Sequence, residues 1–158
     1  MWKSAPKMAS DEGVPPGDGW TAGDGDLDAL VAASWEARER AYAPYSRFLV
    51  GAAVLTDAGV FRGANVENAS YSVAICAERV AASQAVVARD GGKRIRAVAV
   101  TSSQHRPSPP CGVCRQFLFE FNPDMTVVSE GSGGERKVWA LRDILLDGFG
   151  PSDLADVE

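Results

Sequence analysis

The three cysteines of this chain are the residues best suited to chemistry, and they lie in two short motifs. Cys76 is followed two residues later by Glu78, while Cys111 and Cys114 form a Cys-x-x-Cys pair directly after Pro110. Three thiolates can hold a tetrahedral zinc ion and leave its fourth position for water, which is typical of catalytic zinc. A glutamate that does not bind the metal can carry the proton that such a water releases. The motifs therefore predict a catalytic zinc site with Cys76, Cys111 and Cys114 as ligands and Glu78 as the proton carrier.

Two other interpretations of the metal motifs need to be weighed. The cysteines could be buried structural residues, but the flanking glutamate and prolines disfavour this. His105, the only histidine, could join the ligands. A fourth protein ligand would occupy the position that water needs, so we expect His105 to be a solvated loop residue.

Alternating helices and strands are predicted to position these motifs. Apolar periodicity, turn residues and β-branched runs indicate these elements: a helix over residues 27–42 with Asp26 as its cap; strands at 48–56 and 60–65 joined by a hairpin turn at 57–59; helices at 76–88, 111–121 and 141–146; and strands at 95–101, 125–129 and 137–140. Helices should therefore pack on the faces of a sheet whose first two strands are antiparallel. Both ligand motifs would open a helix, where unpaired N–H groups and the helix dipole stabilise thiolates.

Length and composition predict a single folded domain. Residues 1–25 are rich in Gly, Pro, Asp and Ser, which predicts a disordered tail, and residues 26–158 are long enough for one domain. The net charge is −5 and the basic residues form no long stripe, so we expect no nucleic-acid partner. We see no charged leader followed by an apolar run, and no apolar stretch approaching the ~20 residues that span a bilayer. We therefore expect a soluble, cytoplasmic protein that does not bind membranes and keeps its thiols reduced.

Four blocks of the sequence resemble the small, zinc-dependent, homotetrameric cytidine deaminases of pyrimidine salvage. They follow the order of that family, and the metal pattern is the all-cysteine variant of the nucleobase deaminase motif. The blocks are Tyr45-Ser46-Arg47-Phe48-Leu49-Val50-Gly51-Ala52-Ala53, Gly63-Ala64-Asn65-Val66-Glu67-Asn68-Ala69-Ser70-Tyr71, Cys76-Ala77-Glu78-Arg79 and Pro110-Cys111-Gly112-Val113-Cys114-Arg115-Gln116. The resemblance implies an α/β fold, a three-layer α/β/α sandwich with a mixed, roughly five-stranded sheet. It also implies one Zn²⁺ per subunit and hydrolytic deamination of cytidine and 2′-deoxycytidine.

The resemblance also implies roles for individual residues in binding a nucleoside. Asn65 and Glu67 would hold the ribose 3′-hydroxyl, and alternation along an extended segment would put both on one face. Phe48 would pack against the pyrimidine ring, and the backbone of Ala77 would meet the edge of the base. Phe149 would reach the active site of a neighbouring subunit in a homotetramer. The alternatives are a turn-forming Asn65 and a core Phe48.

Two arginines are candidates for moderating the charge of the metal site. Zn²⁺ with three thiolates carries a formal charge of about −1, which weakens its power to acidify water. Arg79 adjoins Glu78, and Arg115 adjoins Cys114. The resemblance implies that both offset thiolate charge, and we hypothesise that they hydrogen-bond the ligand sulfurs. The alternative is that both lie on solvated helix faces.

Three competing functions remain open from the sequence. A deaminase of a cytosine-nucleoside antibiotic of the blasticidin type would share the metal motif. A catalytically inactive zinc-binding module would share the cysteines but would not need Glu78. Editing of cytosine in nucleic acid is less favoured, because it requires an open groove with basic and aromatic residues.

Overall fold

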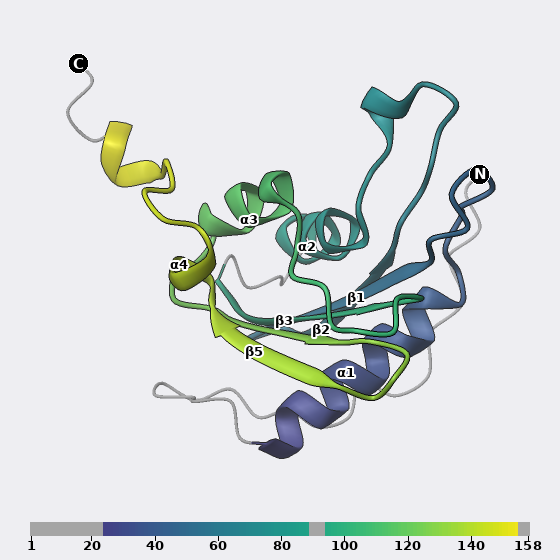
Figure 1. The fold of residues 1–158 in the computed structure, drawn as a ribbon. Coiled ribbons are helices and arrows are strands. Elements are labelled where there is room, and N and C mark those ends of the chain that lie inside the picture. The colour runs from purple at the N-terminus through teal and green to yellow at the C-terminus, as the bar shows by residue number, and fades with distance from the viewer. Residues whose placement is uncertain (1–23, 89–93, 155–158) are drawn as a thin grey trace, which may run out of the picture.

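A mixed five-stranded sheet forms the centre of the fold in the computed structural model, which describes residues 24–88 and 94–154 (Figure 1). The strands lie in the order β2-β1-β3-β4-β5. Only the β3–β4 pair is parallel, and the other three pairs are antiparallel. Their bounds are β1 (Val50–Thr56), β2 (Gly59–Ala64), β3 (Ile95–Ser102), β4 (Thr126–Glu130) and β5 (Arg136–Ala140). The predicted mixed sheet and its antiparallel first hairpin are therefore confirmed.

Helices cover both faces of the sheet, as a three-layer sandwich requires. One face carries α1 (Asp24–Arg38), and the other carries α2 (Ala77–Val87) and α3 (Gly112–Phe119) (Figure 1). Side chains of β1 alternate between them: Ala52 and Val54 join the core under α2 and α3, while Ala53 and Leu55 join the core under α1. The shorter helices are η1 (Tyr71–Val73), α4 (Leu141–Ile144) and η2 (Pro151–Leu154). None of the helices in the described ranges is both long and apolar enough to cross a bilayer.

Glycines let the helices approach the sheet closely on both faces. A Cβ atom on Gly63 of β2 would lie 2.5 Å from the carbonyl oxygen of Ala77, in the first turn of α2. A Cβ atom on Gly51 of β1 would lie 2.0 Å from the carbonyl oxygen of Ser34 in α1. Neither separation is possible for non-bonded atoms, so any larger residue would push a helix away. The glycine in β2 therefore helps to set the position of the helix that carries Glu78.

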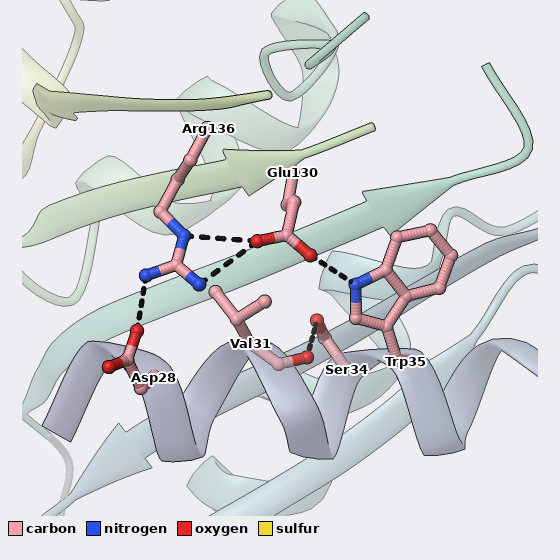
Figure 2. Close-up of polar contacts among 6 residues, drawn as sticks. All are labelled: Asp28, Val31, Ser34, Trp35, Glu130 and Arg136. Carbon is pink, nitrogen blue, oxygen red and sulfur yellow. Dashed lines mark hydrogen bonds and ion pairs between the residues drawn. The ribbon is translucent and has the colours of Figure 1, made fainter. Parts of the chain in front are cut away.

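A network of polar side chains ties α1 to strands β4 and β5 at one edge of the sheet (Figure 2). The indole Nε1 of Trp35 donates a 2.7 Å hydrogen bond to Glu130 Oε1 at the end of β4. Arg136 at the start of β5 donates to Glu130 Oε2 from Nε and Nη2, at 3.1 and 2.9 Å. Its Nη1 pairs with Asp28 in the first half of α1. We refer to Asp28, Trp35, Glu130 and Arg136 as the α1 clamp.

The first helix differs from its predicted bounds, and the difference bears on the site. The helix was expected over residues 27–42, but α1 ends at Arg38, and Asp26 lies inside it and not at its cap. The backbone of Tyr42 pairs instead with the segment after β2: its N–H donates to Asn65 O at 2.9 Å, and its carbonyl accepts from Glu67 N at 2.8 Å. These bonds cannot form if Tyr42 is helical. The predicted tail, residues 1–25, lies outside the described residues except for the last two, which begin α1.

Candidate active site

The three cysteines converge at the N-terminal ends of two helices. Cys76 is the residue immediately before α2, Cys111 the residue before α3, and Cys114 lies buried in the first turn of α3. Their sulfur atoms all lie within 4.8 Å of one another, and those of Cys76 and Cys111 are 3.9 Å apart. Sulfurs at the usual Zn–S distance on a tetrahedral ion are separated by about 3.8 Å. Three free thiols at this spacing fit one zinc ion, with the fourth position left for another ligand.

Electrostatics favours a thiolate at Cys76 even without metal. The pKa of Cys76 is lowered to about 5, mainly by a hydrogen bond with Cys114, and the guanidinium of Arg79 contributes to the same lowering. The same hydrogen bond raises the pKa of Cys114, because loss of its proton would leave two thiolates side by side. Metal ligation requires deprotonated sulfur, so uptake of zinc should release the proton of Cys114.

Glu78 lies beside the thiols in the first turn of α2 and is only 4% exposed. Burial disfavours the carboxylate and raises the pKa of Glu78 to about 7. A carboxyl group with such a pKa can both accept and donate a proton near neutral pH. Glu78 thus has the properties expected of a proton carrier.

A cavity of about 280 Å³ opens onto the thiols and brings most of the predicted site together. Its walls include Cys76, Cys111 and Glu78, together with four of the five predicted substrate-binding residues: Phe48, Asn65, Glu67 and Ala77. The sequence did not indicate the two serines that also line it, Ser102 and Ser108, because they belong to no ligand pattern. A larger cavity of about 480 Å³ lies between α1, β2 and α2, but none of the predicted site residues lines it. We therefore take the smaller cavity, which contains the cysteines and Glu78, as the candidate active site.

Asn65 connects the cavity wall to the start of β1. Its Oδ1 accepts a 2.8 Å hydrogen bond from the backbone N–H of Val50, and its Nδ2 donates a 2.9 Å bond to the carbonyl of Phe48. The amide side chain therefore binds the residues on either side of Leu49. It holds the backbone of Phe48 against the cavity, and the Phe48 side chain stays 40% exposed.

Glu67 binds the loop that precedes β1. Its Oε2 accepts hydrogen bonds from the backbone N–H groups of Tyr45 and Ser46, at 2.9 and 3.2 Å, and its Oε1 accepts from the hydroxyl of Ser46. The Ser46 hydroxyl, followed by the two backbone bonds, lowers the pKa of Glu67, which keeps the carboxylate ionised. Ser46 was not singled out by the sequence, although it lies in a block that carries the family resemblance.

The two arginines occupy different surroundings. Arg79 Nη2 donates to the carbonyl of Ala74 at 3.2 Å, and its guanidinium lies next to the sulfur of Cys76. Arg115 donates from Nε to the carbonyl of Pro110 and from Nη1 to the carbonyl of Ile144, both at 2.7 Å. Arg115 therefore ties the residue before Cys111 to the end of α4.

Phe149 does not line the cavity of its own chain. The residue is 57% exposed. The amide of Gln116 holds its backbone on both sides: Nε2 donates to Phe149 O at 2.6 Å, and Oε1 accepts from Phe149 N at 3.3 Å. The segment leads away from the body of the fold towards the C-terminus (Figure 1). Leu146 and Leu154 on either side are also more than half exposed.

Comparison with known proteins gives a consistent result for sequence and for fold. A profile described as the cytidine and deoxycytidylate deaminase zinc-binding region matches residues 25–130, which include all three cysteines and Glu78. The chain is 43% identical over 133 residues to a cytidine deaminase of Halalkalibacterium halodurans, covering 83% of this chain and 99% of the relative. It is 41% identical over 132 residues to one from Sporosarcina psychrophila, covering 82% and 96% respectively.

Solved structures of similar proteins share the fold. The crystal structure of cytidine deaminase from Burkholderia pseudomallei superposes with a TM-score of 0.73 at 46% identity, covering 77% of this chain and 98% of that one. The cytidine deaminase from Mycobacterium tuberculosis superposes with a TM-score of 0.68 at 37% identity, covering 79% and 98%. The similarity thus extends over almost the whole of each of these proteins.

Proposed function

Because the chain belongs to the family of cytidine and deoxycytidylate deaminases, we propose that it hydrolyses cytidine and 2′-deoxycytidine to the corresponding uracil nucleosides and ammonia. The position of Glu78 next to the thiols supports this activity most directly. Buried Glu78 lines the same cavity as two of the three convergent thiols, and a cavity of about 280 Å³ can hold a small molecule. An inactive zinc-binding module would not need an ionisable group buried at this point, since burial of a carboxylate is unfavourable.

The chemistry follows from the positions of the metal ligands and the carboxylate. When bound by Cys76, Cys111 and Cys114, zinc lowers the pKa of a water molecule, so that water can act as a nucleophile at neutral pH. Glu78 accepts a proton from the water that attacks C4 of the cytosine ring. It delivers this proton to N3. It then accepts the remaining proton from the hydroxyl group now on C4 and delivers it to the amine, so that the C4–N bond breaks and ammonia leaves. Cytidine and one water thus become uridine and ammonia.

Substrate is held by the other walls of the cavity. The ring of Phe48 packs against the pyrimidine, and the backbone of Ala77 at the start of α2 meets the edge of the base. Asn65 and Glu67 hold the ribose 3′-hydroxyl. In support of these roles, all four residues line the cavity that contains Glu78.

Arg79 and Arg115 moderate the charge of the thiolates in this proposal. The effect of Arg79 on the pKa of Cys76 supports its role directly. For Arg115, the hydrogen bond from Nε to the carbonyl of Pro110 supports a place beside Cys111. Replacing Arg79 with Gln should reduce zinc content or turnover, and a variant with both unchanged would contradict this role.

The active enzyme is proposed to be a homotetramer in which Phe149 reaches the site of a neighbouring subunit. Two observations support this: the Gln116 amide fixes the backbone of Phe149 but leaves its ring exposed, and apolar Leu146 and Leu154 flank it. The oligomeric state can be measured by sedimentation equilibrium. Because the three cysteines must stay reduced to bind metal, we propose a cytoplasmic location.

The decisive experiment is a direct assay of the zinc-loaded protein. Conversion of cytidine to uridine lowers the ultraviolet absorbance of the base, and ammonia release gives an independent readout. Deoxycytidine and a blasticidin-type nucleoside should be tested in parallel. Turnover of the blasticidin-type nucleoside would distinguish an antibiotic deaminase from an enzyme of nucleoside salvage. Absence of turnover on cytidine and deoxycytidine with a full complement of zinc would overturn the proposed activity.

A further inference from the structure

The hydroxyl of Ser46 is one of the groups that join the loop between α1 and β1 to the cavity. The Oγ of Ser46 accepts a 2.9 Å hydrogen bond from the backbone N–H of Phe48 and donates to Oε1 of Glu67. A continuous chain of hydrogen bonds therefore runs from Phe48 through Ser46 to Glu67. Its two ends are the residues proposed to contact the base and the ribose, and Asn65 adds a second link through the carbonyl of Phe48.

The conformation of this loop requires support from its neighbours. Arg47, between Ser46 and Phe48, has a φ of 59°, in the left-handed region. For a residue with a Cβ atom this conformation costs free energy. The bonds on either side of Arg47 offset that cost, because Glu67 binds the N–H and hydroxyl of Ser46 and the same hydroxyl binds the N–H of Phe48. Without the hydroxyl the loop loses a contact on each side of the strained residue.

The hydrogen bonds to Glu67 also limit what else the carboxylate can bind. An ionised carboxylate offers about four acceptor positions on its two oxygens. Three donors already use them: the N–H groups of Tyr45 and Ser46, and the hydroxyl of Ser46. About one position is left, which is enough for a single hydroxyl donor. The carboxylate is thus oriented by the loop and equipped to recognise one ribose hydroxyl.

We infer that Ser46 is a positioning residue that sets Glu67 and Phe48 together, so that recognition of the ribose 3′-hydroxyl depends on its side chain. Ser46 acts through these two residues and needs no contact with the reacting atoms. This inference rests on the proposed function, because Glu67 and Phe48 have these roles only if a cytosine nucleoside occupies the cavity.

The test compares two substrates that differ only in the 3′-hydroxyl, cytidine and 3′-deoxycytidine. In the Ser46→Ala variant the KM for cytidine should rise about tenfold, in keeping with the loss of a hydrogen bond to a charged group, while kcat changes little. The preference for cytidine over 3′-deoxycytidine should fall by a similar factor. Ser46→Thr keeps the hydroxyl and should restore both values. Ser70→Ala, a change of the same type at an exposed serine beyond Glu67, should leave them unchanged.

The possible outcomes are distinguishable from one another. If Ser46→Ala lowers kcat/KM equally for both nucleosides, or leaves it unchanged, the positioning role is wrong. The zinc content and melting temperature of each variant show whether a loss of activity is caused by unfolding. If Ser46→Ala does not fold, the Ser46→Thr variant is used to test the role of the hydroxyl. If threonine behaves like alanine while folded and zinc-loaded, the hydroxyl is not the group that matters. A zinc-loaded wild-type protein that deaminates neither cytidine nor deoxycytidine would instead overturn the proposed function, and the role of Ser46 with it.

Discussion

The two faces of the central sheet use polar residues in opposite ways. On the α1 face, the members of the α1 clamp satisfy one another: the Glu130 carboxylate accepts from both Trp35 and Arg136, and Arg136 also binds Asp28 (Figure 2). On the α2 face, Glu78 is buried and its pKa is raised by desolvation. Its position is unfavourable for the free protein but suited to exchanging protons with a substrate.

This difference indicates how stability and chemistry are divided in the fold. Burying a carboxyl group costs free energy, so we expect the buried Glu78 to lower the stability that packing gives to the α2 face. The α1 clamp joins α1 to β4 and β5, and therefore stabilises the same sheet from the other side. Substitutions on the α2 face should mainly change activity, and substitutions in the α1 clamp should mainly change stability.

The largest effect is expected from Cys114→Ala, which removes the buried ligand. Two thiolates cannot replace three, so zinc content should fall close to zero and turnover of cytidine by at least about 100-fold. Metal analysis of the purified variant and the absorbance assay measure the two quantities. Val113→Ala changes an exposed neighbour in the same helix turn and should retain both zinc and activity. A Cys114→Ala variant with normal zinc would exclude the proposed ligand set.

Glu78→Gln should separate catalysis from metal binding on the same face. Glutamine keeps the shape of the side chain but cannot carry a proton, and general acid–base groups contribute about 10²–10⁴-fold to rates. Turnover should therefore fall by that factor while zinc content stays at the wild-type level. The melting temperature should be equal or higher, because a buried ionisable group has been removed. Wild-type turnover in this variant would refute the role of Glu78.

The local patterns of the sequence predicted most of the fold and the placement of the cysteine motifs. The cysteine spacing and the helix starts are local features, so they indicated the candidate ligands and placed both motifs at helix N-termini. The strands and the helices α2, α3 and α4 lie within two residues of their predicted bounds, while the short helices η1 and η2 were not predicted. The first helix, α1, begins three residues and ends four residues before its predicted bounds. Its end depends on the pairing of Tyr42 with the segment 65–67. Local periodicity carries no information about such a partner.

The α1 clamp and the link from Ser46 to Glu67 could not be predicted for the same reason. Trp35 and Glu130 are separated by 95 positions, and nothing in either local sequence indicates that they meet. Ser46 and Glu67 are closer, but their contact occurs beside a left-handed turn at Arg47, a conformation that the residue type disfavours. Interactions of this kind depend on the assembled sheet.

Trp35→Phe should weaken the α1 clamp without affecting the chemistry. Phenylalanine keeps much of the packing but removes the indole N–H, so Glu130 loses one hydrogen bond. We expect a loss of about 1–2 kcal/mol in the free energy of unfolding, and no change in kcat or KM. Urea denaturation of the zinc-loaded protein measures the first, and the cytidine assay measures the second. Trp139→Phe is the matched comparison, because it makes the same replacement at a partly buried residue that packs against the core under α2. A fall in kcat with Trp35→Phe would show that the two faces are not independent.

Asp28→Asn should give the smallest effect and define the outer limit of the α1 clamp. The Asp28 side chain is 65% exposed, so its ion pair with Arg136 is screened by solvent. Exposed pairs contribute about 0–1 kcal/mol, and Arg136 keeps its two bonds to Glu130 in this variant. The difference in the urea midpoint from wild type should be small at low ionic strength and should vanish at about 1 M salt. If the shift in the urea midpoint equals the shift caused by Trp35→Phe and persists in salt, Asp28 stabilises α1 by more than its charge. Its contribution to the α1 clamp is then as large as that of Trp35.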